Sequence, residues 1–250
     1  MTIDINTWLG HWPFRPFRIH TAKALAAHLA QEGIKAALVS SPEAVFEFDP
    51  GPANARLIKC LAHYSRLHPC PVVNPLIAGA ADRLKQYART NIRAIRLLPN
   101  YQGWELKAAP AAAVWEACRD QGLMPIVQMR LDDERAHHPS AMVPGVSARE
   151  LTAIARARPD MKFVACCAYF AEAVQLGQDT DNVFVDIAFA ESLNTLPSLL
   201  AQIPACRIVF GSHTPFLYTR AAIMKVHAPG NRKPDRDRIL YKNSSKLLGL

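Results

Sequence analysis

The sequence lacks the features that mark membrane, secreted and disulfide-rich proteins. No run approaches the roughly 18 apolar residues that a helix needs to span a bilayer. The N-terminus has no basic segment followed by an apolar stretch, so no signal peptide is evident. The 6 cysteines form no Cys-x-x-Cys pair, and they are too few among 250 residues for a disulfide scaffold. We therefore expect a soluble, cytoplasmic protein with no membrane partner, whose cysteines are mostly buried and reduced.

Acidic residues are the scarcer charged class, with 21 Asp and Glu against 29 Lys and Arg, and the formal net charge is +8. The basic residues are scattered over many segments, without a zinc-finger, RNA-recognition or helix-turn-helix signature, so we expect no nucleic-acid partner. Such a surplus is typical of a soluble surface. The alternative that remains open is attraction of a small anionic substrate.

Strand-like and helix-like segments alternate along the whole chain. Strands are predicted at 3–5, 34–39, 71–75, 92–98, 123–130, 161–165, 182–187 and 206–210. Helices are predicted at 21–30, 53–67, 80–89, 108–121, 147–158, 170–176, 193–201, 215–226 and 235–248, with Thr21 and Ser147 as N-caps. Eight strands, each followed by a helix or long loop, favour an α/β fold of the closed (β/α)8 TIM-barrel type, a single domain over 1–250, rather than an open sheet.

The eighth predicted strand opens into a polar turn. After the apolar run 208–210, Gly211 permits a tight turn, and Ser212, His213 and Thr214 place three polar side chains on it. Pro215 suits the first position of a following helix. In parallel α/β folds, ligands and chemistry usually lie just beyond the carboxyl ends of the strands, so this turn is a candidate functional loop.

In a barrel, polar residues at the carboxyl ends of all the strands point into one mouth. From this set, which also includes Asp132, we select catalytic and substrate-binding candidates. The catalytic candidates are His213, Asp4 and Asp186, and the substrate-binding candidates are Asn6, Arg96, Gln128, Arg130, Asp133 and His138. An inward arginine must pair with an acid or bind an anion, so Arg96 and Arg130 either bind the substrate or pair with Asp4, Asp133 or Asp186.

The metal-ligand pattern of a barrel hydrolase is missing from the first strand. A zinc hydrolase would carry His-x-His there, with single His residues on later strands and Asp on the eighth. Here the positions read Asp4-x-Asn6, and Asn is a poor zinc ligand. We therefore predict no metal and no other cofactor. The less favoured alternative is a divalent metal such as zinc at a rebuilt site that uses His11, His138 or His213.

Four segments carry a family resemblance. They are 3–6 (Ile-Asp-Ile-Asn), 92–99 (Ile-Arg-Ala-Ile-Arg-Leu-Leu-Pro), 210–216 (Phe-Gly-Ser-His-Thr-Pro-Phe) and 239–249 (Ile-Leu-Tyr-Lys-Asn-Ser-Ser-Lys-Leu-Leu-Gly). Together they resemble the amidohydrolase superfamily, in the group of 2-pyrone-4,6-dicarboxylate lactonase and the aminocarboxymuconate-semialdehyde and related benzoate decarboxylases. The third segment resembles the Phe-Gly-Ser-Asp-x-Pro motif of the eighth strand, and the fourth resembles the closing helix.

The resemblance implies a (β/α)8 barrel whose mouth handles small carboxylated substrates. It places the metal-ligand positions of the family at Asn6 and Trp8, near 128–130 and at Cys166 or Cys167. The water-activating Asp of the family falls on His213. Some relatives, such as the lactonase, hydrolyse without a metal, with Asp as the base and Arg and His holding the carboxylates.

The leading hypothesis is a metal-independent hydrolase of a small carboxylated ester, lactone or related carbonyl compound. His213 is the expected general base, because an imidazole titrates near neutral pH, with Asp4 or Asp186 orienting it. Arg96 and Arg130 bind the substrate anion, and Asn6 and Gln128 add neutral hydrogen bonds. One alternative is a non-catalytic barrel that binds an anionic ligand or partner. Another is a metal-dependent hydrolase or decarboxylase. A homodimer is the expected assembly if the chain self-associates.

Overall fold

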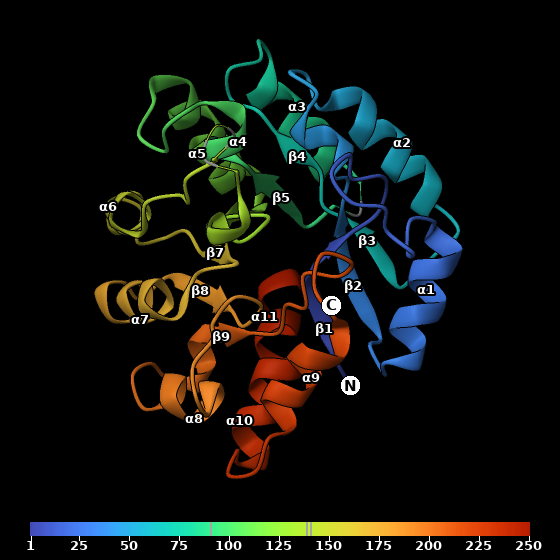
Figure 1. The fold of residues 1–250 in the computed structure, drawn as a ribbon. Coiled ribbons are helices and arrows are strands. Elements are labelled where there is room, and N and C mark those ends of the chain that lie inside the picture. The colour runs from blue at the N-terminus through green and yellow to red at the C-terminus, as the bar shows by residue number, and fades with distance from the viewer. Residues whose placement is uncertain (91, 139, 141) are drawn as a thin grey trace.

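The computed structural model describes residues 1–90, 92–138, 140 and 142–250. Short parallel strands surround a central axis, and helices cover their outer side (Figure 1). The strands are β1 (Ile3–Trp8), β2 (Ala36–Ser40), β3 (Leu67–Pro69), β4 (Val72–Val73), β5 (Ala94–Leu97), β6 (Met124–Gln128), β7 (Phe163–Cys166), β8 (Val183–Asp186) and β9 (Ile208–Val209).

The strands pair in chain order and return to the first. One sheet has the order β1-β2-β3 and the other runs from β4 to β9, with every neighbouring pair parallel. β3 and β4 are separated only by Cys70 and Pro71, where the missing proline N–H interrupts the ladder. The Ile5 amide donates to the Phe210 carbonyl at 3.1 Å and joins the β9 side to β1. The predicted (β/α)8 barrel is therefore confirmed.

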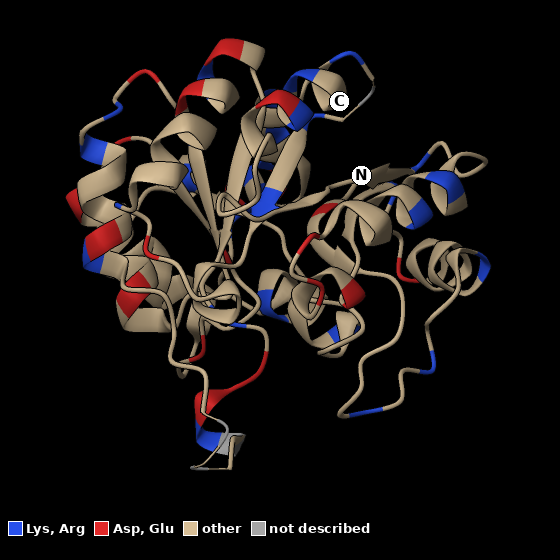
Figure 2. Cartoon of the chain, turned by 90° about the horizontal axis from the view of Figure 1, so that it is seen from above, with Lys and Arg blue, Asp and Glu red and all other residues tan. Residues whose placement is uncertain are grey.

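Helices form the layer outside the strands (Figure 1). The helices of the chain are α1 (Ala22–Gln31), α2 (Gly51–Leu61), α3 (Ala80–Ala88), α4 (Pro99–Gln102), α5 (Ala109–Gln121), α6 (Ala148–Arg156), α7 (Phe170–Asp179), α8 (Thr195–Leu200), α9 (Thr219–His227), α10 (Lys233–Asp237) and α11 (Asn243–Leu248). Helices such as α1, α5 and α6 form the outer layer because they bury apolar residues against the strands. Lys and Arg are spread over many of these elements, with Asp and Glu between them (Figure 2).

Alternate residues of each strand face opposite sides of the barrel wall. On β5, Ile95 and Leu97 join the cluster under the helices, whereas Ala94 belongs to the cluster inside the barrel. The amino end of the interior is apolar, and Leu248 of α11 packs there against strand residues such as Leu38. The carboxyl end of the interior holds polar side chains instead, so the candidates from the sequence gather in one layer.

Several local predictions have clear outcomes. Thr21 and Ser147 do cap α1 and α6, since their hydroxyls accept from the amides of Ala24 and Glu150. The predicted helix 53–67 is too long, because α2 ends at Leu61 and β3 begins at Leu67. Pro215 does not start a helix, since α9 begins at Thr219.

Gly211 serves a different purpose from the tight turn that we predicted. A Cβ atom there would lie 2.5 Å from Oδ2 of Asp186, so the missing side chain makes room for that carboxylate. The cysteines follow the expectation, with Cys70, Cys118, Cys166 and Cys167 buried and all six unpaired. Within the described part of the chain, no helix is long and apolar enough to cross a membrane.

Candidate active site

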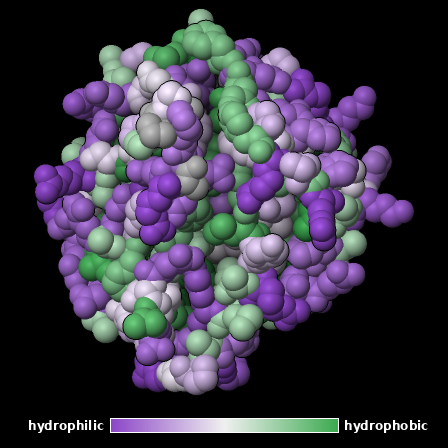
Figure 3. Space-filling model, in the orientation of Figure 1, coloured by the Kyte–Doolittle hydropathy of each residue, from purple (hydrophilic) through white to green (hydrophobic). Residues whose placement is uncertain are grey.

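A cavity of about 1160 Å³ opens at the carboxyl ends of the strands. It lies on the face seen in Figure 3, where hydrophobic side chains gather around a hollow. Its aromatic lining comes from segments that follow six different strands, namely Trp12, Phe46, Tyr101, Tyr169, Phe189 and Phe216. A large apolar cavity built from the βα loops is where a barrel enzyme binds its substrate.

The aromatic wall is held by contacts between rings. The Trp12 ring meets Phe216 edge to face at 4.9 Å between centroids and lies 5.1 Å from Phe46. Phe17 meets the same Phe216 ring at 4.8 Å. Such pairs stabilise a surface by about 0.5–1.5 kcal/mol each beyond the area that they bury. The loop after β1, rich in Trp, Pro and Phe, therefore forms one side of the cavity.

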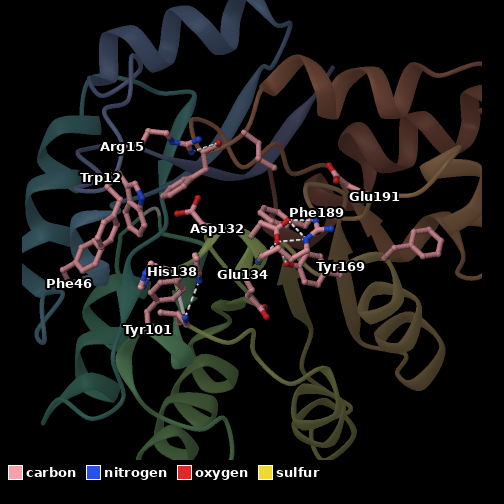
Figure 4. Close-up of a pocket in the computed structure, with 18 of the residues that line it drawn as sticks. Trp12, Arg15, Phe46, Tyr101, Asp132, Glu134, His138, Tyr169, Phe189 and Glu191 are labelled. Atoms are coloured by element: carbon pink, nitrogen blue, oxygen red, sulfur yellow. Dashed lines mark hydrogen bonds and ion pairs between the residues drawn. The ribbon is translucent and has the colours of Figure 1, made fainter. Parts of the chain in front are cut away.

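Asp132 points into the cavity between these walls (Figure 4). Its carboxyl is half-buried, and this burial raises its pKa above the ordinary value. The positive charges of Arg15 and His137 and a hydrogen bond from Trp12 offset part of that rise. A carboxyl with a perturbed pKa in a cleft is a candidate for proton transfer.

Arg15 is an exposed cation on the cavity lining and is a candidate for binding a substrate anion. It lines the cavity, and its Nη2 donates to the Phe216 carbonyl oxygen at 2.8 Å. That bond ties the loop after β1 to the segment after β9. The guanidinium has five N–H donors, so one carbonyl contact leaves it capable of binding a carboxylate.

Arg130 is engaged within the protein rather than facing the cavity. Its side chain is 2% exposed, and Nη1 and Nη2 each lie 2.7 Å from a different oxygen of Glu172. Nε donates to Glu134 at 3.0 Å, and the guanidinium carbon lies 3.7 Å from the centroid of the Tyr169 ring. The expectation that Arg130 pairs with Asp4, Asp133 or Asp186 is therefore wrong. Its acidic partners are Glu134 and Glu172 instead.

Arg96 occupies the centre of the barrel, fully buried. Nη1 donates to the side-chain oxygens of Asn6 and Gln128, and Nε donates to Ser40 Oγ at 2.8 Å. The guanidinium also lies over the Trp8 ring, 4.6 Å from its centroid. Its partners are two side-chain amides, a hydroxyl and the Ile5 carbonyl oxygen, not the three aspartates that we predicted.

His213 lies beneath the cavity floor and is fully buried. Its Nε2 lies 2.7 Å from the Leu131 carbonyl oxygen, and its ring stacks on Phe216 at 4.7 Å. Burial lowers the pKa of His213 to about 3. Phe216 thus separates the imidazole from the cavity, so His213 does not reach a substrate bound there.

Asp186 and Asp4 are buried on the same side of the barrel. Asp186 accepts from the Asn6 amide group at 2.7 Å and from the Cys167 backbone at 2.9 Å, and burial raises its pKa. Asp4 accepts from the backbone amides of Asn6 and Ser212, each at 3.0 Å. Its second oxygen, Oδ2, is buried with no hydrogen-bond partner among the described residues. Among the described residues, the His213 ring nitrogens face Trp8, Asn6 and Leu131, and neither carboxylate is hydrogen-bonded to them.

Asp133 and His138 lie at the rim. Asp133 accepts from Arg135 and from the Tyr169 hydroxyl, and both Asp133 and His138 line the cavity. Nδ1 of His138 lies 2.7 Å from Ser140 Oγ. The candidates therefore divide into two groups. The rim holds Asp133 and His138, and the buried residues are Asn6, Arg96, Gln128, Arg130, Asp186, Asp4 and His213.

The sequence selection missed Asp132, Arg15 and Trp12. Asp132 belongs to the polar set after the sixth observed strand, so its position was a usable signal. The loop that carries Trp12 and Arg15 is conspicuous for its aromatic and proline content. Nothing in the spacing shows which mouth residues remain accessible once that loop packs on Phe216.

The family model described as Amidohydrolase matches residues 12–250, so the chain belongs to the amidohydrolase family. No curated protein matches it in sequence. It is similar in fold to dihydroxybenzoic acid decarboxylase from Polaromonas sp. JS666, at 14% identity and a TM-score of 0.77, with 100% of this chain and 97% of that chain covered. It is also similar to 5-carboxyvanillate decarboxylase from Sphingomonas paucimobilis, at 12% identity and a TM-score of 0.78, with 100% and 99% covered.

The prediction that the protein uses no cofactor is contradicted by these comparisons. The Polaromonas enzyme was crystallised with manganese, as was the 5-carboxyvanillate decarboxylase from Novosphingobium aromaticivorans, which has 11% identity and a TM-score of 0.72 over 100% of this chain and 96% of that chain. These structures therefore overturn our expectation that no cofactor is used.

The buried polar layer does not fit a divalent metal. Among the described residues, no group of three His, Cys, Asp or Glu side chains could hold such an ion. The donors at the barrel centre are the neutral amides of Asn6 and Gln128, and the Arg96 guanidinium already takes their oxygens. A second positive charge beside it would be repelled.

Proposed function

We propose that the protein is a hydrolase that cleaves a small carboxylated aromatic ester or lactone in the aromatic cavity. The observation that carries the proposal is the Asp132 carboxyl, half-buried among aromatic walls with its pKa raised by that burial. A carboxyl of this kind is suited to general acid–base catalysis. Asp132 thus takes the role that the sequence suggested for His213.

In the proposed step, Asp132 accepts a proton from a water molecule while the water oxygen bonds to the carbonyl carbon of the substrate. The carbonyl π electrons move onto the carbonyl oxygen. When they return, the ester C–O bond breaks, and the leaving oxygen takes the proton back from Asp132. The products are a carboxylic acid and an alcohol or phenol, and water is the sole co-reactant.

Binding of the substrate is assigned to the cavity walls and to Arg15. The rings of Trp12 and Phe216 provide apolar surface for an aromatic substrate. The Arg15 guanidinium provides a paired-donor surface for its carboxylate. This assignment keeps the expected small anionic substrate. It moves the anion contact away from Arg96 and Arg130, whose guanidinium groups are bonded inside the protein.

The test uses 4-carboxyphenyl acetate, its uncharged analogue phenyl acetate and the lactone dihydrocoumarin, with acid release followed in a pH-stat. Each assay is run with and without added manganese, because relatives of this fold bind that ion. We expect Asp132→Asn to lower turnover by about 10²–10⁴-fold. The matched control is Asp82→Asn, a surface carboxylate paired with Lys85. Equal rates for wild type and Asp132→Asn would remove Asp132 from the mechanism.

A decarboxylase is the second candidate, favoured by the same cavity. An apolar aromatic site disfavours a bound carboxylate relative to neutral CO₂, and similar folds include decarboxylases of aromatic acids. Protonated Asp132 would deliver its proton to the ring carbon as the bond to the carboxyl carbon breaks and CO₂ leaves. Release of CO₂ from 2,6-dihydroxybenzoate or 5-carboxyvanillate, without hydrolysis of the esters, would decide for this candidate.

A further inference from the structure

Leu131, the residue before Asp132, is anchored from the opposite part of the barrel mouth. It is buried, and its carbonyl oxygen lies 2.7 Å from Nε2 of His213. Leu131 follows β6, whereas His213 follows β9. The backbone that carries Asp132 is therefore joined to another strand end by a hydrogen bond that solvent does not reach.

The hydrogen bonds define the protonation of the imidazole. A carbonyl oxygen accepts and cannot donate, so Nε2 of His213 carries the proton. Nδ1 is then an acceptor for the Trp8 indole N–H, which lies 3.2 Å away and is shared with Oδ1 of Asn6. That Asn6 oxygen also lies 3.3 Å from Nδ1, and Trp8 supplies the proton between the two acceptors. Since burial lowers the pKa of His213 to about 3, the ring stays neutral near physiological pH. His213 is thus a fixed donor toward Leu131 and a poor proton acceptor for catalysis.

The ring is also fixed by its surroundings. It stacks on Phe216 with an interplanar angle of 19°, and Phe189 and Trp8 meet it edge to face at 5.8 and 6.1 Å. The His213 backbone has a φ of 56°, a left-handed conformation that is uncommon outside glycine. Strained residues of this kind persist where the surroundings over-determine them, often at functional sites.

We propose that His213 is a positioning residue, which holds the Leu131 carbonyl and thereby aims the Asp132 carboxylate into the cavity. This inference rests on the proposed function, in which Asp132 is the proton-transfer group. Displacement of a reacting group by about 1 Å can cost about 100-fold in rate, so one buried hydrogen bond to the adjacent residue is enough to matter.

Other groups also face Asp132 and must be held constant in a test. Arg15, His137 and Trp12 each lower the pKa of Asp132 against the effect of burial. Arg135 and Asp133 pair with each other on the same loop. Arg15 and Trp12 both contact Phe216, whose ring stacks on His213. A single substitution at His213 is therefore not enough, and two variants that differ in the hydrogen bond to Leu131 must be compared.

The matched variants are His213→Gln and His213→Leu. A glutamine amide keeps an N–H donor for the Leu131 carbonyl, whereas leucine has similar size without one. We expect His213→Gln to retain most activity toward 4-carboxyphenyl acetate. His213→Leu should lower kcat by about 10–100-fold with KM within about twofold, because the anchor is lost and the cavity walls remain.

A second readout needs no substrate. The pKa of Asp132 is measured by ¹³C NMR of its side-chain carboxyl, whose signal is identified by its loss in Asp132→Asn. We expect a raised pKa in wild type and His213→Gln, and a value near the ordinary 3.9 or so in His213→Leu, as the carboxylate turns to water. An unchanged Asp132 pKa in a folded His213→Leu protein would overturn the proposal. So would equal loss of activity in both variants, which indicates direct catalysis by His213.

If His213→Leu does not fold, the imidazole of the wild type still gives an answer. ¹⁵N NMR should find a neutral ring protonated at Nε2 from pH 8 down to about pH 4, as the buried contacts require. A ring protonated at Nδ1, or an imidazolium near pH 7, would refute the anchor. An active Asp132→Asn protein would instead refute the proposed function, and these NMR results on His213 would stand.

Discussion

Arg130 and Glu172 form a two-point ion pair behind the wall of the cavity, with both nitrogen–oxygen distances at 2.7 Å. The pair joins the end of β6 to the start of α7, and the Tyr169 ring lies over the guanidinium. A planar guanidinium matched to a carboxylate in this way fixes geometry as well as charge. Tyr169 and Glu134 line the cavity and both contact Arg130, so the cavity wall depends on Arg130 although Arg130 does not line the cavity.

Removing the carboxylate of this pair should destabilise the fold. Glu172→Gln leaves the buried Arg130 with Glu134 as its remaining acidic partner, and we expect a loss of about 2 kcal/mol in the free energy of unfolding. Urea unfolding followed by circular dichroism measures it. Lys85→Met, which breaks an exposed pair with Asp82, should change stability by less than about 0.5 kcal/mol. Equal effects of the two variants would contradict the prediction.

Gly145 is predicted to tolerate no side chain. A Cβ there would lie 2.6 Å from Oε1 of Glu134 and would also collide with Arg130, whose side chain is held in place. We expect Gly145→Ala to cost about 1–3 kcal/mol. The control is Gly51→Ala, where a Cβ would lie 2.5 Å from the end of the part-exposed Arg83 side chain, which can move. Thermal unfolding should separate the two, and similar melting temperatures would argue against a rigid Arg130.

Asp4 should make the fold less stable as pH rises from about 4 to about 7. Burial raises its pKa to about 7, so the folded protein keeps a proton that the unfolded chain has already released. Stability is therefore lost as pH rises across this window, by up to about 4 kcal/mol, and levels off above it. Asp4→Asn keeps an oxygen for the amides of Asn6 and Ser212 but cannot titrate, so its stability curve should be flatter.

The measurement for Asp4 is urea unfolding at several pH values between 4.5 and 8. Asp49→Asn serves as the control, because Arg83 lowers the pKa of Asp49 and places its titration below this window. Parallel curves for wild type and Asp4→Asn would mean that Asp4 is already ionised in the folded protein.

The pH dependence of turnover should distinguish the two proposed reactions. Hydrolysis needs ionised Asp132, so the rate should rise with pH through a pKa above the ordinary aspartate value. Decarboxylation needs the protonated form, and its rate should fall through the same pKa. Arg15→Gln removes a positive charge that lowers this pKa, so the midpoint should move to higher pH in either case. An unmoved midpoint would place Arg15 too far from Asp132 to act on it.

Much of the barrel could be predicted from the sequence because its signals are local. Apolar strands, helix caps such as Thr21 and Ser147, and their alternation specify the elements one by one. The predicted elements differ from the observed ones where contacts between distant segments determine the local structure. β3 contains Pro69, and its pairing with β2 rather than its composition makes it a strand. Pro215 belongs to the loop that packs on the cavity wall, so no helix starts there.

The residues of the buried polar layer could be predicted from the sequence, but the residues that line the cavity above it could not. Strand-end positions correctly bring Asn6, Arg96, Gln128 and Asp186 into one layer. Whether a side chain in that layer meets a substrate depends on Phe216 and Trp12, which lie above it through ring contacts between distant segments. Spacing along one chain carries no information on such contacts. The sequence therefore points to His213 as the general base, although Asp132 is the residue that lines the cavity.

The Phe216 ring has consequences for how this protein can change. One face of the ring lies on His213, and the ring also lines the cavity together with Trp12. Substitutions on the cavity side can therefore alter substrate preference without breaking the hydrogen bonds beneath. Laboratory evolution toward new substrates should accumulate changes at Trp12, Tyr101 and Phe189, whereas Asn6 and Arg96 should remain constant. Residues on the cavity side of Phe216 would then change faster than residues beneath it.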